Sequence, residues 1–206
     1  MTEGASFGEL ALLLDKPRTA TIYTKSPQTT LCMLHKRDYQ ALIGESFKTR
    51  MDRACKELSR FELFTKIRIP RQLFAVSYYV KERHFIRNAW VYRQGDNPVD
   101  GIYLVKEGEV EVRWRGDDGV EGGITNRMPE VVMSVAGEGE AIGVQEIIDG
   151  LNERLQGVLV KSERAVLLQI QKEDFIERVL VLHPEVKKHL IRENEIKKHY
   201  HKKREV

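Results

Sequence analysis

Part of this sequence recurs further along the chain. Arg18 recurs 136 positions later as Arg154. Gly8 recurs 135 positions later as Gly143, so the second copy has one more residue between its glycine and its arginine. Three more positions are similar at the same spacing of 136 residues: Lys36 and Lys172, Asp38 and Asp174, Tyr39 and Phe175. Self-similarity at a fixed spacing predicts a duplicated structural unit. The 206 residues are enough for one or two domains.

The first copy contains a stretch, residues 4–22, whose residue types indicate an anion site. Its glycines precede a short apolar run that we expect to be a helix, and the unpaired N–H groups and dipole at a helix start favour an anion. Gly8 allows a sharp turn and a close approach of the backbone to a ligand. Arg18 offers a planar fork of donors that suits a phosphate. Glu9 would repel a phosphate but would accept a hydrogen bond from a sugar hydroxyl, so the stretch predicts a nucleotide.

These residues resemble the phosphate-binding cassette of cyclic nucleotide-binding domains, through Phe7-Gly8-Glu9-Leu10-Ala11 and Pro17-Arg18-Thr19-Ala20-Thr21. Such domains regulate cyclic-nucleotide-dependent kinases, some channels and bacterial catabolite regulators. The resemblance implies that Glu9 and the Gly8 backbone hold the ribose 2′-hydroxyl and that Arg18 pairs with the cyclic phosphate. The Ala11 and Thr19 amides would complete the cradle. The ligand-binding residues that the resemblance implies are Gly8, Glu9, Leu10, Ala11, Arg18, Thr19 and Ala20.

The resemblance leaves cAMP and cGMP open as ligands. Thr19 resembles the residue of the cGMP-dependent kinases, where the cAMP-dependent ones usually have alanine. An aromatic or apolar lid over the base is also implied, and Leu73, Phe74 or Tyr78 could supply it.

The second copy keeps Gly143 and Arg154, but its cassette is degenerate. Val144 stands where the ribose carboxylate should be, and Leu155 and Gln156 replace the small residues after the arginine. A site built to hydrogen-bond a hydroxyl loses much discrimination when its acceptor is gone. Glu146 lies one turn away, and we do not expect it to substitute. We therefore expect this copy to bind cyclic nucleotide weakly or not at all.

Local patterns predict the secondary structure around the first cassette. A turn at 26–28 between β-prone runs at 19–24 and 29–34 predicts a hairpin. Apolar residues at three-to-four spacing over 39–61 predict helices, with a break at Gly44.

Further along, Pro70 predicts the start of a helix toward Tyr79. Glycine turns divide residues 90–112 into strands that also resemble the early strands of a cyclic nucleotide-binding β-roll. A strand at 166–170 would close that roll. Helices are expected over 172–182 and, after the break at His183-Pro184, from Glu185.

We therefore expect an α+β fold, an antiparallel, jelly-roll-like β-roll with flanking helices, in two tandem copies. Residues 1–57 would hold the C-terminal part of a first domain: its cassette, last strands and hinge helices. Residues 58–183 would form the second, degenerate domain, and 184–206 a basic helix or tail. The first copy lacks the N-terminal strands, which we expect either upstream on a longer chain or from a partner, because an open half-roll would expose unpaired edges.

Other classes of function have weaker support. Gly4-Ala5-Ser6-Phe7-Gly8 fits the G-x-S-x-G elbow of hydrolases, but that motif needs a preceding strand and βα alternation. We find no P-loop, and neither the six histidines nor Cys32 and Cys55 have metal-ligand spacing. We expect no enzymatic activity, no catalytic residue, no metal and no cofactor.

Charge is concentrated at the end of the chain. The net charge is +3, yet residues 186–206 contain eight Lys or Arg against three Glu. Such a segment either contacts nucleic acid, an acidic protein surface or anionic lipid, or is the exposed face of a terminal helix. It is too short for a helix-turn-helix, so we expect no sequence-specific DNA binding.

No apolar run reaches the length of a membrane span, and the two cysteines suit a reducing cytosol. We expect a cytoplasmic protein, with a cytoskeletal or ciliary place as an option.

The function that these patterns favour is a non-enzymatic cyclic-nucleotide sensor, similar to a kinase regulatory subunit. Ligand at the first cassette would draw the helices of residues 35–64 onto the site and change what a protein partner contacts. A kinase catalytic subunit is one candidate partner. The alternative is a structural scaffold that keeps the fold without responding to nucleotide, docked in a large assembly such as a ciliary axoneme.

Overall fold

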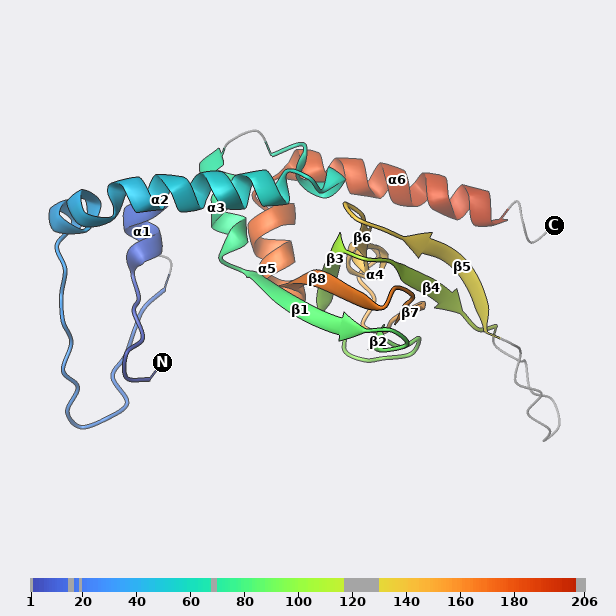
Figure 1. Cartoon of the computed structure of the whole chain (residues 1–206), viewed down its shortest axis with the longest axis horizontal. Coiled ribbons are helices and arrows are strands. Elements are labelled where there is room, and N and C mark those ends of the chain that lie inside the picture. The colour runs from blue at the N-terminus through green and yellow to red at the C-terminus, as the bar shows by residue number, and fades with distance from the viewer. Residues whose placement is uncertain (1, 15–16, 19, 68–69, 117–129, 203–206) are drawn as a thin grey trace.

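The computed structural model describes the chain except residues 1, 15–16, 19, 68–69, 117–129 and 203–206 (Figure 1). Its described part has two regions of different character. Helix and coil make up the chain as far as Leu58, and a two-sheet roll with packed helices follows it. Figure 1 shows the long helix α2 leading from the first region to the roll.

The roll consists of two antiparallel four-stranded sheets in the described residues, ordered β1-β8-β3-β6 and β2-β7-β4-β5. The longest pairings run along β8, which pairs with β1 on one side and β3 on the other. The strands are β1 Val80–Ile86, β2 Trp90–Tyr92, β3 Gly101–Glu107, β4 Val110–Trp114, β5 Val131–Ala136, β6 Ala141–Ile142, β7 Gly157–Val160 and β8 Arg164–Gln171.

Strand β3 shows how this sequence builds a core on both faces of one sheet. Successive side chains of a strand point to opposite faces. Tyr103 and Val105 accordingly pack with residues of the other sheet, in the cluster between the two sheets. Ile102 and Leu104 point the other way, into a second cluster under the helices. Because both faces are covered, β3 is buried from Gly101 to Val105.

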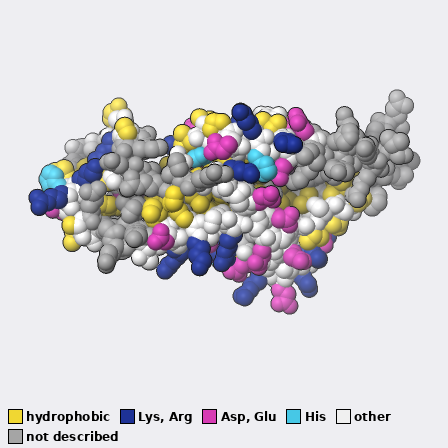
Figure 2. Space-filling view, turned by 90° about the horizontal axis from the view of Figure 1, so that it is seen from above, with side chains coloured by type: hydrophobic (Ala, Val, Ile, Leu, Met, Phe, Trp, Pro, Cys, Tyr) yellow, Lys and Arg dark blue, Asp and Glu magenta, His cyan; other side chains and the backbone are white. Residues whose placement is uncertain are grey.

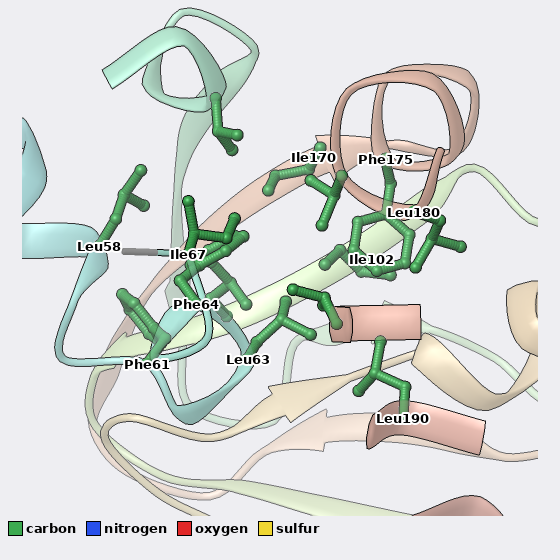
Figure 3. Packing of buried hydrophobic residues seen from close by; sticks show 14 of the residues in the cluster. Leu58, Phe61, Leu63, Phe64, Ile67, Ile102, Ile170, Phe175, Leu180 and Leu190 are labelled. Atoms are coloured by element: carbon green, nitrogen blue, oxygen red, sulfur yellow. The ribbon is translucent and has the colours of Figure 1, made fainter. Parts of the chain in front are cut away.

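The helices around the roll are positioned by that second cluster (Figure 3). Fully burying one Leu, Ile or Phe side chain contributes about 1.5–3 kcal/mol, so the cluster fixes the helices firmly. It combines strand residues with Phe64, Phe175, Leu180 and Leu190 from the helices. The helices are η1 Glu62–Phe64, α3 Pro70–Ser77, α4 Val144–Ile148, α5 Lys172–Asp174, the π-type helix η2 Phe175–Leu180 and α6 Pro184–Lys202.

The region before the roll contains α1 Glu9–Leu14 and α2 Lys36–Leu58, and the described residues between them are coil. The predicted hairpin at 19–24 and 29–34 is wrong: the described residues 20–34 form no strand. A β-prone run becomes a strand only where another strand pairs with it, and here Tyr23 and Met33 are 82% and 80% exposed. The turn at 26–28 does form, with Ser26 Oγ and Thr29 Oγ1 2.7 Å apart.

The predicted helix break at Gly44 is also wrong, because α2 continues through it. A single helical glycine costs only about 1 kcal/mol relative to alanine, which a helix of this length tolerates. The helix start at Pro70 and the strands over 90–112 are confirmed.

The α+β class, with an antiparallel roll and flanking helices, is confirmed. The described residues contain one such roll, so the structure does not establish two tandem copies. None of the described helices has the length and apolar character that crossing a membrane requires. In Figure 2, seen from the side of α2 and α6, charged groups of both signs are interspersed on the described surface.

Candidate functional site

Gly8 and Arg18 of the first cassette lie together in the structure. Arg18 Nη1 donates a hydrogen bond to the Gly8 carbonyl oxygen at 2.6 Å. Gly8 has a φ of +86°, a conformation that other residues rarely adopt. A Cβ at this position would also lie 2.6 Å from Arg18 Nη1. The turn and the close approach of the guanidinium therefore both depend on glycine here.

Glu9 follows directly and begins α1. Its side-chain atom Oε2 is buried and has no hydrogen-bond partner among the described residues. A buried carboxylate oxygen without a donor is costly, so this atom suits a ligand that brings one.

The other predicted ligand-binding residues of this cassette surround that turn. Leu10 and Ala11 are in α1, and Ala20 is exposed in the coil beyond Arg18. Thr19 and the Leu10 side chain lie outside the described residues. Arg18 is exposed, and its carbonyl bond to Gly8 is its single interaction with the described residues.

Gly143 and Arg154 reproduce the same local contact in the roll. Gly143 has a φ of +74° and precedes α4, as Gly8 precedes α1. Arg154 Nη1 donates to the Gly143 carbonyl oxygen at 3.4 Å, and a Cβ on Gly143 would collide with that nitrogen. The repeated spacing in the sequence therefore corresponds to a repeated local geometry.

The surroundings of Arg154 differ from those of Arg18, because other groups of the same chain accept the hydrogen bonds of the Arg154 guanidinium. Arg154 is only 2% exposed. Its Nη2 donates to Asp100 Oδ1 at 2.6 Å and to the Gly101 carbonyl at 2.5 Å. The guanidinium carbon lies 3.9 Å from the centre of the Tyr92 ring, and Glu146 Oε2 is 3.8 Å from Nη1.

Asp100, the main partner of Arg154, is fixed in place on its other oxygen. Asp100 Oδ2 accepts hydrogen bonds from the Tyr103 hydroxyl at 2.5 Å and from Gln169 Nε2 at 2.7 Å. Burial, and then this bond to Asp100, raise the pKa of Tyr103, so its hydroxyl keeps its proton and stays a donor. Burial also raises the pKa of Tyr92, with Glu146 adding to the effect. The network is thus a preformed anion site whose anion is a side chain of the same chain.

A cavity of about 580 Å³ lies next to this network. Tyr92, Gly143 and Glu146 line it, together with β5 and with residues of η1 and α6. Arg154 is not among the lining residues. A ligand in the cavity would meet the buried Glu146, which is 4% exposed, rather than the arginine behind it.

Comparison with known proteins assigns the roll to a family. The sequence model of the Cyclic nucleotide-binding domain matches residues 82–180, from β1 to the end of η2. The roll is a member of the cyclic nucleotide-binding domain family. The matched residues contain the second cassette, in which Arg154 is paired with Asp100.

Curated relatives are regulatory proteins. The chain is 31% identical over 119 residues to a cAMP-dependent protein kinase regulatory subunit of Emericella nidulans, covering 55% of this chain and 27% of that one. It is 28% identical over 142 residues to a cAMP-dependent protein kinase type II regulatory subunit of Drosophila melanogaster, covering 66% of this chain and 33% of that one. The chain thus matches about a third of these relatives' length or less.

Solved structures share the fold over more of the chain. The regulatory domain of Toxoplasma gondii PKA, crystallised with cAMP, superposes with a TM-score of 0.61 at 20% identity, covering 92% of this chain and 66% of that one. The regulatory subunit of a cAMP-independent protein kinase A from Trypanosoma cruzi, bound to guanosine, gives 0.60 at 19% identity, covering 93% and 62%.

The sequence prediction missed the residues that close the site in the cyclic nucleotide-binding domain. Asp100 and Tyr92 are more than fifty positions from Arg154, and no local pattern links them to it. Glu146 could have been singled out from the sequence. The 135-residue spacing aligns it with Ala11, a predicted ligand-binding residue of the first cassette. The candidate lid residues Leu73 and Phe74 are buried in α3, and Tyr78 packs edge-on against Phe74. Their role over a base stays a prediction.

Proposed function

We propose that this chain is a non-enzymatic regulatory protein that responds to a cyclic nucleotide bound at the first cassette, similar to a kinase regulatory subunit. The observation that carries the proposal is the buried, unpartnered Oε2 of Glu9 beside the contact between Gly8 and Arg18. A ribose hydroxyl would satisfy that oxygen, and a cyclic phosphate would take the remaining donors of the guanidinium.

The first cassette is the better candidate because its arginine is available. Arg18 has five N–H donors, and one of them is used by Gly8. It is exposed, and among the described residues no carboxylate forms an ion pair with it. A phosphate can therefore bind without first displacing an internal anion.

The second cassette is proposed not to respond to cyclic nucleotide. A phosphate would have to replace Asp100, which is already bonded to Arg154, Tyr103 and Gln169. It would also approach the carboxylate of Glu146, and like charges at close range repel. This domain would then serve as a rigid body on which the first region moves.

The tandem arrangement is part of the proposal. Residues 1–57 would be the C-terminal part of one cyclic nucleotide-binding domain, 58–183 the second domain, and 184–206 a basic helix or tail. The repeated Gly–Arg geometry supports this division, and so does a fold likeness that covers 92% of the chain rather than the roll alone.

The partner that the relatives suggest is a kinase catalytic subunit, because the matched proteins are kinase regulatory subunits. The choice between cAMP and cGMP is left to measurement, with Thr19 favouring some binding of cGMP. A scaffold that no longer responds to nucleotide is the second candidate, and the closed second cassette is the observation in its favour.

The test is calorimetric titration of the chain with cAMP and, separately, with cGMP. We expect one site, and Arg18→Ala and Glu9→Ala should each weaken binding about 10- to 100-fold, the value of a hydrogen bond to a charged group. Arg164→Ala and Glu107→Ala are matched controls at exposed positions on the roll, away from the cassette, and should bind as the unmodified chain does. No binding of either nucleotide, or equal affinity in all four variants, would overturn the proposal and leave the scaffold.

A further inference from the structure

Three potential metal-ligating side chains from two separate helices meet in the lining of the cavity. Glu62 belongs to η1, and His189 and Glu193 belong to α6. One ligand atom from each lies within 4.8 Å of the other two. We propose that these residues bind a divalent transition-metal ion, Zn²⁺ in particular, which would join α6 to η1. This site is distinct from both cassettes.

The histidine is the strongest indication. His189 Nε2 is buried and has no hydrogen-bond partner among the described residues. Its nearest carboxylate oxygen, Glu193 Oε1, is 3.5 Å away, beyond the range of a good hydrogen bond. A buried imidazole nitrogen that neither donates nor accepts is costly, and a metal ion would take its lone pair.

The spacing fits a small tetrahedral ion. Zn²⁺ binds imidazole nitrogen and carboxylate oxygen at about 2.0–2.2 Å, so two neighbouring ligands of a tetrahedral site lie roughly 3.4 Å apart. The 3.5 Å between His189 Nε2 and Glu193 Oε1 already matches this value. The side chain of Glu62 is exposed, so it can adjust to complete the set.

The helices bring these groups together before any ion binds. His189 and Glu193 are four positions apart and therefore share one face of α6. Leu63, next to Glu62, and Leu190, next to His189, are both buried in the cluster that packs the helices on the roll. Because this packing fixes both backbones, binding would order few groups.

The ligand types select the ion. One neutral imidazole and two carboxylates offer a net charge of −2, which favours a divalent cation. Imidazole suits Zn²⁺, whereas Mg²⁺ prefers oxygen alone and keeps most of its waters. The three side chains also line the cavity, so a bound ion would hold together the parts of its wall that η1 and α6 form.

The test is titration of the full chain with Zn²⁺ by calorimetry, in a background where His199 and His201 are replaced by alanine to remove competing imidazoles. We expect one ion per chain. His189→Ala should weaken binding at least about tenfold, as loss of a first ligand does, and Glu62→Gln and Glu193→Gln each several-fold. His84→Ala is the matched control, since His84 is exposed on β1, and Mg²⁺ should not bind at the same concentration.

A second readout locates the ion. Zn²⁺ should slow amide hydrogen exchange in η1 and around His189 of α6. In the His189→Ala variant, Zn²⁺ should leave the exchange rates in these segments unchanged. If His189→Ala does not fold, Glu193→Gln, at a partly exposed position, gives the same comparison. Equal Zn²⁺ affinity in these variants, or protection that appears elsewhere in the chain, would overturn the proposal.

Discussion

The two cassettes share one contact and differ in what surrounds it. In each, an arginine donates to the carbonyl of a glycine with positive φ, ten or eleven residues earlier. Arg18 is exposed and makes that bond alone among the described residues. Arg154 is buried and also bonds to Asp100 and Gly101, with Tyr92 and Glu146 against it.

This difference shows that a repeated local geometry does not by itself fix what the arginine contacts. The same Gly–Arg pair either leaves its arginine exposed or pairs it with a carboxylate, depending on side chains that come from elsewhere in the fold. In the cyclic nucleotide-binding domain, Asp100 forms the ion pair with the arginine. The arginine there has become part of the core.

The strongest test of this comparison is the stability of the two alanine variants. Arg154→Ala leaves the buried Glu146 carboxylate and the bonded Asp100 without their cation, so it should lower the free energy of unfolding by about 3 kcal/mol. Arg18→Ala removes an exposed group and should change it by less than about 0.5 kcal/mol. Urea denaturation measures both, and equal effects would contradict the comparison.

Replacing the cassette glycine by alanine should lower stability more in the second cassette than in the first. In Gly143→Ala the Cβ meets a guanidinium that the core cannot move, and the φ of +74° adds strain, so we expect a loss of about 2 kcal/mol. In Gly8→Ala the exposed Arg18 can swing away, which leaves a backbone penalty of about 1 kcal/mol. Thermal unfolding of the two variants gives the order, and a larger loss at Gly8 would reverse our interpretation.

The closed cassette should open when its internal anions are removed. Asp100→Asn with Glu146→Ala takes away both carboxylates that compete with a phosphate for Arg154. In an Arg18→Ala background, this double variant should bind cAMP at least tenfold more tightly than the background alone, about 1.4 kcal/mol. Displacement of a fluorescent cyclic nucleotide measures the gain. No gain would mean that Val144, Leu155 and Gln156 alone keep the site closed.

The smallest expected effect concerns the link between the two regions. Lys106 on β3 pairs with Glu57 of α2 at 2.7 Å and with Glu82 of β1 at 2.6 Å. The hydrogen bond from Lys106 lowers the pKa of Glu82 below its ordinary value. The stabilisation is therefore present above the unfolded pKa of a glutamate and is lost as pH falls through the lower folded value.

Lys106→Met should remove that part of the acid dependence, at a cost below about 1 kcal/mol because these side chains are partly exposed. Unfolding free energies measured at neutral pH and across the acid range test it. The same acid dependence in the unmodified chain and in Lys106→Met would show that the ion pairs of Lys106 do not contribute to stability.

Several elements followed from the sequence because their causes are local. Alternation with glycine turns predicted the strands over 90–112, and Pro70 predicted a helix start, as the structure confirms. The residue types placed Gly8 and Arg18, ten residues apart, in one predicted anion site, and in the structure the Arg18 guanidinium donates to the Gly8 carbonyl. The hairpin at 19–34 failed because a strand depends on a partner that the sequence pattern cannot guarantee.

The sequence by itself determined the positions of the two Gly–Arg pairs in the chain and that the roll is an antiparallel β structure. Only the tertiary structure decided that Arg154 is neutralised by Asp100, 54 positions away, and that His189 meets Glu62 from another helix. The physical reason is that backbone turns are set by neighbouring residues, whereas the charge that a side chain meets is set by whichever distant segments the core packs against it.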